Sequence, residues 1–285
     1  MKRITAAAAP CGEPGKPYVL FPFYSCGRPL EHSAPVWGMT LRAAGSMRFR
    51  WSETNGTRMR VLADLAARGT ERALSPVQLE LIHSRTVCDV SSFSDTFGLQ
   101  GDGMITVQKN LLPVVTVADC MPLYLFDPVT GVFGAVHSGW KGTGIIGQAV
   151  RLASERYGAD PATVCIAVGP HIRDCCYVVD SERADYFRRT FCEDCVTPYE
   201  PGTDDQSVLN WNRNGGILFR LSLEKANMAV LARAGIRDEN IVAADDCTSC
   251  CSAFGSFRRE TAGIAESEKW RSFTVQAAFC GYVSL

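Results

Sequence analysis

The sequence predicts an α+β fold in which mixed sheets are flanked by helices. Three short runs of β-branched or apolar residues, at 113–117, 123–126 and 132–136, are typical of strands. The last two are separated by the turn-forming sequence Asp-Pro-Val-Thr-Gly at 127–131, which indicates a hairpin. Because hairpins and helices follow one another without regular strand–helix–strand alternation, a doubly wound parallel sheet is not expected.

Apolar residues at helical spacing predict four helices along the chain. Gly69, Gly158 and Gly235 stand where three of these helices would end, because glycine readily adopts the left-handed conformation of a helix C-terminus. The expected helices span 57–68, 145–157, 181–192 and 221–234, and further extended chain is expected at 77–87, 164–168 and 273–279.

The domain organisation follows from composition. The chain has 285 residues, 46% of them hydrophobic and 21% charged, which is enough for one large core. Residues 1–34 contain five prolines and several glycines, so we expect an irregular N-terminal segment there. Residues 35–285 are expected to form a single catalytic domain.

Charge and cysteine usage bear on partners and compartment. Lys and Arg total 29 against 30 for Asp and Glu, so nucleic acid and anionic membranes are not expected as partners. No stretch approaches the roughly 20 apolar residues of a membrane span, and the N-terminus lacks the apolar run of an export signal. Thirteen irregularly spaced cysteines indicate reduced thiols rather than a disulfide framework. We therefore expect a soluble, cytoplasmic protein, either monomeric or weakly homo-oligomeric.

Three residues that can bind metals stand at the ends of predicted strands: His83, Cys120 and His137. Zinc accepts thiolate and imidazole, and catalytic zinc sites use three protein ligands beside an open position. The separations of 37 and 17 residues form no local chelate. On these residues alone, hydrogen-bonded structural histidines and a small buried cysteine are the more common interpretation.

Three motifs resemble, in order and spacing, those of the bacterial YfiH-like, laccase-domain family. They are ADCMP at 118–122, HSGWKGT at 137–143 and GPHIRDCCYVV at 169–179. Weaker similarity extends to TLR at 40–42, DGMIT at 102–106 and SFRR at 256–259, so the resemblance covers roughly residues 35 to 280. Leu81, Ala44-Gly45 and Gly263-Ile264 depart from the family's pattern.

The resemblance implies a fold, a metal and an activity. The fold would be a layered α/β sandwich similar to the toxin deamidases, and the zinc ligands would be His83, Cys120 and His137. Family members are described as purine nucleoside enzymes that phosphorolyse adenosine, inosine, guanosine and methylthioadenosine and deaminate adenosine. The expected substrates are therefore a nucleoside and phosphate. The family's older label is polyphenol oxidase, or laccase.

Cys120, His137 and Asp119 are the candidate catalytic residues. For deamination, zinc acidifies water toward a pKa of about 7 and so supplies a nucleophile for the purine. Asp119 and Asp102 are the carboxylates best placed to move protons. Asp119 could equally accept hydrogen bonds that orient the loop of Cys120.

The candidate substrate contacts are mostly cations and backbone amides. Residues 139–144 lead into a predicted helix whose N-terminus would favour phosphate; the alternative is that the glycines only permit a tight turn. Trp140 could stack on a purine or anchor the core, and His171 could line the site. The predicted substrate-binding residues are Arg42, Lys141, Gly142, Thr143 and Arg258, with Arg259 as a further cation.

Three alternatives use the same sequence differently. Cys120 with His137 as its base would make a zinc-free hydrolase, and its substrate could be an amino-sugar peptide of a cell-wall precursor. Copper is less favoured than zinc, because four histidines are too few for a multicopper oxidase. A non-enzymatic zinc or thiol-rich binding protein is the last alternative, since the CxxC spacings at 192–195 and 247–250 could form a second metal site or a redox pair.

Overall fold

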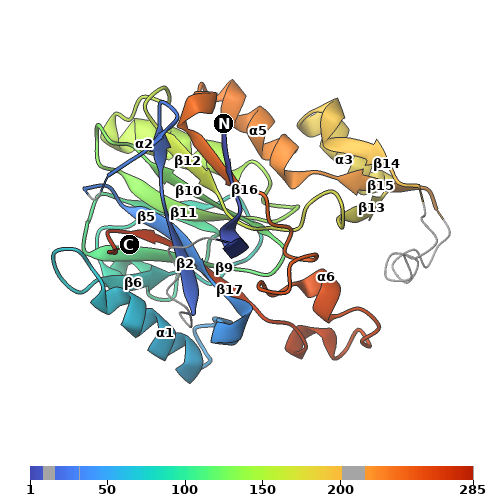
Figure 1. Ribbon diagram of the computed structural model, residues 1–285, viewed down its shortest axis with the longest axis horizontal. Coiled ribbons are helices and arrows are strands. Elements are labelled where there is room, and N and C mark those ends of the chain that lie inside the picture. The colour runs from blue at the N-terminus through green and yellow to red at the C-terminus, as the bar shows by residue number, and fades with distance from the viewer. Residues whose placement is uncertain (9–16, 32, 201–215, 285) are drawn as a thin grey trace.

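The computed structural model describes residues 1–8, 17–31, 33–200 and 216–284. Within these ranges, two mixed sheets pack face to face with helices on both outer faces (Figure 1). The predicted class, mixed sheets flanked by helices, is confirmed. None of the helices in the described ranges is both long and apolar enough to cross a membrane.

The larger sheet has the strand order β1-β16-β12-β10-β11-β8-β7. β10 and β11 form the predicted antiparallel hairpin, with Leu123 opposite Val136. The β1–β16, β12–β16 and β7–β8 pairs are parallel, so the sheet is mixed. Its strands are β1 (Lys2–Ile4), β16 (Ile241–Ala244), β12 (Cys165–Val168), β10 (Met121–Phe126), β11 (Phe133–Ser138), β8 (Gly103–Thr106) and β7 (Val87–Asp89).

The second sheet has the order β2-β5-β17-β9-β6. Its strands are β2 (Tyr18–Pro22), β5 (Val36–Thr40), β17 (Gln276–Gly281), β9 (Leu111–Val117) and β6 (Ser75–Gln78). β1 and β2 both lie in the segment that the sequence led us to expect as irregular. β1 pairs with β16, which is distant along the chain, and β2 pairs with β5, which follows Pro35. Local sequence reveals neither partner. The assignment of residues 35–285 as a separate domain stays a prediction.

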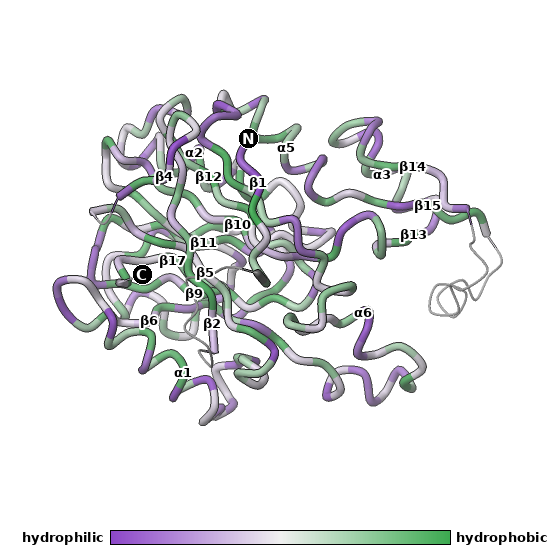
Figure 2. Tube along the Cα trace, in the orientation of Figure 1, coloured by the Kyte–Doolittle hydropathy of each residue, from purple (hydrophilic) through white to green (hydrophobic). Residues whose placement is uncertain are grey.

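The apolar core between the two sheets is built from large aromatic side chains. Trp37 of β5 and Tyr124 of β10 are fully buried with ring centroids 5.2 Å apart, and the Tyr124 hydroxyl donates to the carbonyl of Gly38. A Cβ at Gly38 would lie 2.3 Å from the carbonyl oxygen of Val19, so only glycine fits between these strands. Figure 2 shows the hydrophobic stretches concentrated in the strands at the middle of the molecule.

Helices cover the outer faces of both sheets. α2 (Ile145–Tyr157) and α5 (Leu223–Arg233) pack on the larger sheet, and α1 (Gly56–Ala67) packs on the smaller one. Gly158 ends α2 in the left-handed conformation at φ 73°, as predicted. The expected helix at 181–192 is shorter, because α3 (Ser181–Thr190) gives way to a turn, and α5 begins two residues later than expected, after its N-cap Ser222.

A small three-stranded sheet and α3 project from one end of the molecule (Figure 1). Its strands are β13 (Val178–Asp180), β15 (Leu218–Leu221) and β14 (Val196–Pro198). The remaining elements of the described residues are β3 (Tyr24–Ser25), β4 (Arg28–Pro29), α6 (Phe257–Glu260) and short 3-10 turns at Ala6–Ala8, Arg42–Ala44, Phe93–Thr96, Glu193–Cys195, Asp238–Asn240 and Lys269–Arg271.

Candidate metal centre

Two of the three predicted ligands lie on connections that cross from one sheet to the other. The chain leaves the smaller sheet at the end of β9 and enters the larger one at β10, and Cys120 lies in this crossing. His83 lies in the crossing from β6 to β7. The expected continuous extended chain over 77–87 is therefore wrong, because it is broken at His83, where φ is 59°. His137 is close to the end of β11, opposite Pro122.

The structure brings the three side chains together. One ligand atom each of His83, Cys120 and His137 lies within 4.8 Å of the other two, and the two imidazole centroids are 5.0 Å apart. A Cβ at Gly139 would lie 3.1 Å from the Cys120 sulfur, 3.4 Å from the His83 ring and 3.5 Å from the His137 ring. The glycine thus leaves room among the three donors that any other residue would fill.

Asp102 contacts both histidines of this group through hydrogen bonds. The Asp102 carboxylate is fully buried, and its Oδ1 lies 2.9 Å from His137 Nδ1 and accepts from the backbone N–H of His83 at 3.0 Å. Its Oδ2 accepts from the backbone N–H of Ser84 at 2.6 Å and from the Ser84 hydroxyl at 2.8 Å. Because Nδ1 of His137 is used by Asp102, Nε2 is the nitrogen left to bind a metal or to meet the thiol.

Electrostatics favour the thiolate form of Cys120. Burial alone would raise the pKa of this thiol, but the charge and hydrogen bond of His137, together with His83, outweigh it and lower the pKa to about 6. Burial would likewise lower the pKa of His137, yet the Cys120 thiolate and Asp102 raise it to about 10. Burial would raise the pKa of Asp102, but hydrogen bonds from His137 and Ser84 lower it. Thiolate is the form in which cysteine binds metals or acts as a nucleophile.

The three donors lie at the wall of a cavity of about 470 Å³. This volume is in the range of about 300–1,000 Å³ typical of small-molecule sites. Four arginines line it: Arg48, Arg50, Arg183 and Arg258. The aromatic lining residues are Phe49, Trp140, Tyr177, Phe257 and Phe273.

Asp119 lines the cavity but both of its carboxylate oxygens are already engaged. Oδ1 accepts from the Thr248 hydroxyl and Oδ2 from the backbone N–H of Arg258, each at 2.6 Å. Burial raises its pKa, although these hydrogen bonds counteract the rise. Its backbone has φ of 78°, in the left-handed region. These contacts fit the alternative in which Asp119 orients the loop that carries Cys120.

Of the five predicted substrate contacts, only Arg258 lines the cavity. Arg42 forms an ion pair with Glu260 at 3.2 Å. The Thr143 hydroxyl is buried and donates to the carbonyl of Gly139, and a Cβ at Gly142 would lie 2.7 Å from the carbonyl of Ser84. The four predicted substrate contacts that do not line the cavity are Arg42, Lys141, Gly142 and Thr143.

At the start of α2, the backbone N–H of Gly144 already donates to a side chain of the protein. The Asn227 side chain is fully buried and accepts from the backbone N–H of Gly144 at 3.1 Å. The glycines here permit close packing at a tight turn, which was the alternative to a phosphate site. His171, considered as a lining residue, is buried away from the cavity with Nδ1 2.9 Å from the carbonyl of Gly169.

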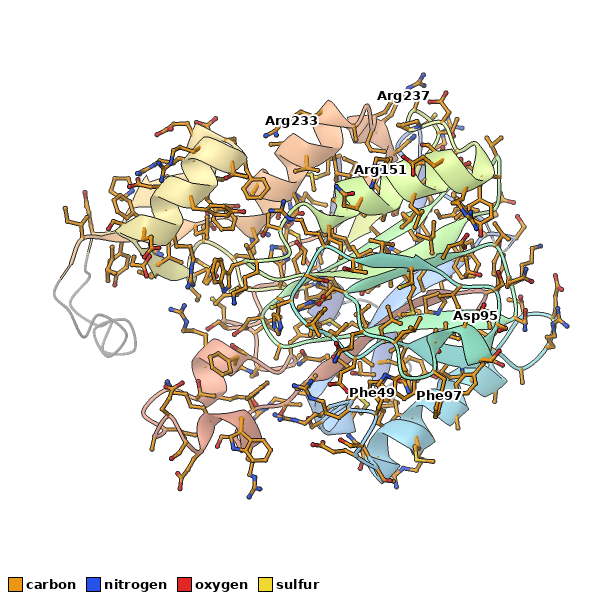
Figure 3. The ribbon with its side chains drawn as sticks, turned by 180° about the vertical axis from the view of Figure 1, so that it is seen from behind. Phe49, Asp95, Phe97, Arg151, Arg233 and Arg237 are labelled. Carbon is orange, nitrogen blue, oxygen red and sulfur yellow. The ribbon has the colours of Figure 1, made fainter. Side chains whose placement is uncertain are left out.

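Sequence reasoning missed Arg48 and Arg183 as cavity residues. The guanidinium of Arg183 lies 4.3 Å from the centroid of the Trp140 ring, which is 36% exposed. Arg48 belongs to Arg48-Phe49-Arg50-Trp51, an alternation of basic and aromatic residues that could have marked a binding surface. The aromatic contacts continue from Phe49 through Trp51 to Phe97, at centroid distances of 4.9 and 5.3 Å (Figure 3).

Comparison with known proteins shows which family the chain belongs to. A family model described as multi-copper polyphenol oxidoreductase laccase matches residues 53–267. The chain belongs to this family. The matched range of the laccase family includes all three candidate ligands, and the resemblance inferred from the sequence motifs is confirmed.

Two curated relatives illustrate the laccase family's named activities. Purine nucleoside phosphorylase YlmD of Geobacillus stearothermophilus is 34% identical over 179 residues, covering 59% of this chain and 61% of the relative. Adenosine deaminase RL5, from an unknown prokaryotic organism, is 31% identical over 161 residues, covering 55% of this chain and 56% of the relative. The alignments thus span little more than half the length of these relatives.

A solved structure covers more of the chain. Hypothetical protein YfiH from Bacillus licheniformis has a TM-score of 0.70 and 25% identity, covering 87% of this chain and 92% of that one. The fold expected from the resemblance is therefore confirmed over most of the molecule.

Proposed function

We propose that this chain is a metal-dependent purine nucleoside enzyme that phosphorolyses nucleosides and deaminates adenosine. The observation that carries the proposal is the convergence of His83, Cys120 and His137 at the wall of a cavity lined by arginines and aromatic rings. Relatives named purine nucleoside phosphorylase and adenosine deaminase support the same substrate class.

The donor set fits zinc. Two imidazoles and one thiolate match the three-ligand sets of catalytic zinc, and the described residues place no fourth His, Cys, Asp or Glu donor in this group. A multicopper centre needs many histidines, whereas this chain has four, of which His171 lies apart in the core. When bound, zinc supplies Lewis-acid chemistry that acidifies water or polarises a substrate oxygen.

The chain's own residues bind and orient the reactants. Asp102 fixes the ring of His137 and the backbone at His83, so the donors are positioned before a substrate arrives. The guanidiniums of Arg48, Arg183 and Arg258 offer forked donors for phosphate. Tyr177 and Trp140 are aromatic residues of the same cavity lining that a purine could contact. We assign Asp119 a positioning role, through its contacts with Thr248 and Arg258.

Product analysis tests the proposal. Purified protein is incubated with adenosine, with and without phosphate, and the products are separated. Adenine with ribose 1-phosphate indicates phosphorolysis, and inosine with ammonia indicates deamination by water. Cys120→Ala should lose activity and the metal held with His83 and His137, whereas Cys192→Ala, a half-buried cysteine outside the cavity lining, should keep both. A fully active Cys120→Ala protein would contradict the site.

A second candidate function rests on the same geometry. Cys120, His137 and Asp102 have the order of a nucleophile, a base and the carboxylate that orients the base. Such a hydrolase would act without metal, for example on amino-sugar peptides of cell-wall precursors. Activity that survives complete removal of metal by a chelator favours this hydrolase, and activity that returns only with zinc favours the nucleoside enzyme.

A further inference from the structure

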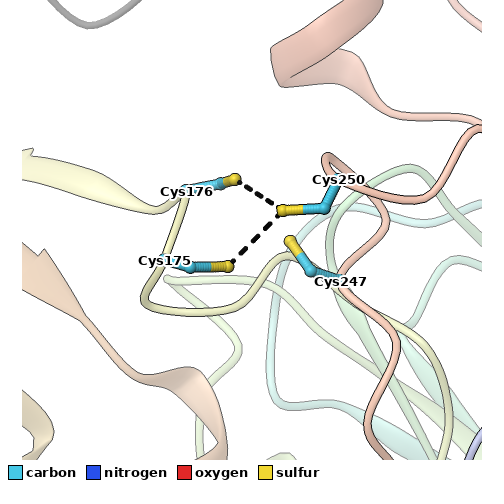
Figure 4. A group of neighbouring side chains, drawn as sticks. All are labelled: Cys175, Cys176, Cys247 and Cys250. Carbon is cyan, nitrogen blue, oxygen red and sulfur yellow. Dashed lines mark hydrogen bonds between the residues drawn. The ribbon is translucent and has the colours of Figure 1, made fainter. Parts of the chain in front are cut away.

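A second group of metal-binding side chains lies outside the cavity described above. The sulfur atoms of Cys175, Cys176, Cys247 and Cys250 all lie within 4.8 Å of one another. Figure 4 shows the sulfurs converging from two loops, one before β13 and one after β16. The CxxC pair at 192–195 contributes no sulfur to the group, so the structure pairs 247–250 with the adjacent cysteines of the GPHIRDCCYVV motif instead.

We propose that these four cysteines bind one thiophilic divalent cation, zinc, as a closed structural site. A tetrahedron of sulfurs around zinc at a bond length of about 2.3 Å has edges of about 3.8 Å. The Cys250 sulfur lies 3.7 Å from that of Cys175 and 3.3 Å from that of Cys176. These separations are close to such edges, and rotation of the exposed Cys175 and Cys250 side chains would adjust them further.

The two loops are joined by their backbones before any metal binds. His171 and Cys247 form a parallel bridge, and the backbone N–H of Thr248 donates to the carbonyl of His171 at 3.0 Å. The Arg173 N–H points to the Cys247 sulfur at 3.4 Å. Cys250 and Cys251 donate backbone N–H groups to the carbonyl of Cys247, which forms the tight turn of a CxxC chelate.

Cationic side chains surround the group. Arg220 donates to the carbonyl of Cys175 at 2.6 Å, Arg173 donates to Asp245 at 2.9 Å, and Arg259 donates to the carbonyl of Cys251 at 3.0 Å. Four thiolates around a divalent cation carry a net charge of −2, and the guanidinium of Arg220 offsets part of it, whereas Arg173 and Arg259 are also paired with Asp245 and Glu260.

The site would have a structural consequence for the metal centre. Thr248, next to Cys247, donates its hydroxyl to Asp119, the neighbour of Cys120. A cation at the four cysteines would therefore fix the loop that holds Asp119 in place. It leaves no coordination position for substrate, because all four donors come from the protein.

Metal content measured by mass spectrometry on the full chain tests the proposal. The reduced wild-type protein, loaded with zinc and desalted, should hold two zinc ions per chain. Cys250→Ser should hold one, and His83→Ala should also hold one. Cys26→Ser, which removes an exposed cysteine outside the group, should hold two. If His83→Ala holds one ion and wild type also holds one, the three-ligand centre fails while the cysteine site stands.

Cobalt spectra of the His83→Ala variant provide a readout that does not depend on the number of metal ions per chain. Cobalt at the four cysteines should give sulfur-to-cobalt charge-transfer bands with the intense visible bands of tetrahedral coordination, and Cys250→Ser added to this variant should remove them. A His83→Ala protein that binds no cobalt, or binds it without sulfur bands, overturns the proposal. Mass-spectrometric detection of a disulfide between Cys250 and Cys175 or Cys176 in freshly purified protein also overturns it.

Discussion

Asp102→Asn isolates the role of the carboxylate beneath the metal centre. Oδ1 of Asp102 serves His137 and His83, and Oδ2 serves the N–H and hydroxyl of Ser84. An asparagine has nearly the same shape but offers only one acceptor atom. If the asparagine oxygen keeps the contacts with His137 and His83, its NH2 group faces Ser84. The backbone N–H of Ser84 then has no acceptor, whereas the Ser84 hydroxyl can rotate and accept from the NH2 group.

The expected cost follows from that count. A fully buried N–H without a partner costs about 1–3 kcal/mol of stability, and because Ser84 is half-buried we expect a loss near the lower end, about 1 kcal/mol. Loss of the carboxylate that supports a ligating histidine lowers metal affinity by roughly 10- to 100-fold, or about 1.4–2.7 kcal/mol. Both quantities are measurable, by thermal unfolding of the metal-free protein and by competition for zinc with a chelator of known affinity.

Asp95→Asn is the matched control for Asp102→Asn. Asp95 also accepts from two backbone N–H groups and a serine hydroxyl, but it is exposed on the surface at Phe93–Thr96 (Figure 3). Its replacement should leave zinc affinity unchanged. If Asp102→Asn binds zinc within twofold of wild type, the reasoning on His137 is refuted.

Three further substitutions give separate tests. Gly139→Ala should reduce zinc retention at the His83 centre, because its Cβ would lie 3.1 Å from the Cys120 sulfur, as measured by metal analysis. Arg183→Gln should raise the KM for phosphate roughly tenfold or more in the phosphorolysis assay, since a charge-assisted hydrogen bond contributes about 1.5–3 kcal/mol. Asn227→Ala should lower the free energy of unfolding by about 1–3 kcal/mol, because the N–H of Gly144 loses its buried acceptor, as measured by denaturant titration.

Each of these tests has a control and a contradicting result. Gly56→Ala places its Cβ in open space and should keep the metal, so equal zinc retention in both glycine variants would refute the steric argument. Arg151→Gln removes an exposed arginine of α2 (Figure 3) and should leave the KM unchanged. An unchanged KM in Arg183→Gln would remove that residue from the phosphate site. For Asn227, a loss below about 0.5 kcal/mol, typical of surface substitutions, would contradict its buried role.

Local sequence patterns predicted the elements that depend on local interactions. The β10–β11 hairpin and α2 with its terminal Gly158 lie close to where periodicity and turn residues placed them. β1 was missed because three residues carry no readable alternation and its partner β16 is about 240 residues away. β13 was missed for the same reason of length, since it has three residues.

The candidate site depended on contacts that spacing cannot encode. Cys120 and His83 meet because both lie where the chain crosses between the sheets, and nothing in their separation reveals this. The motifs identified them only through family resemblance. Asp102 was considered as a proton carrier, whereas its hydrogen bonds make it the support of His137. The cysteine group remained hidden because an adjacent pair and a CxxC pair come from different loops.

The placement of the first and last strands has a consequence for biosynthesis. β17 lies between β5 and β9, and β16 lies between β1 and β12, so the last strands of the chain occupy interior positions in both large sheets. Neither sheet can complete its strand pairing until β16 and β17 leave the ribosome. Until then, β5 and β9 each have one edge without a hydrogen-bonding partner strand. Such non-local pairing slows folding and exposes strand edges to aggregation. We expect nascent chains that stop before residue 276 to depend on chaperones and to be degraded rapidly, even though the three predicted metal ligands have already been translated.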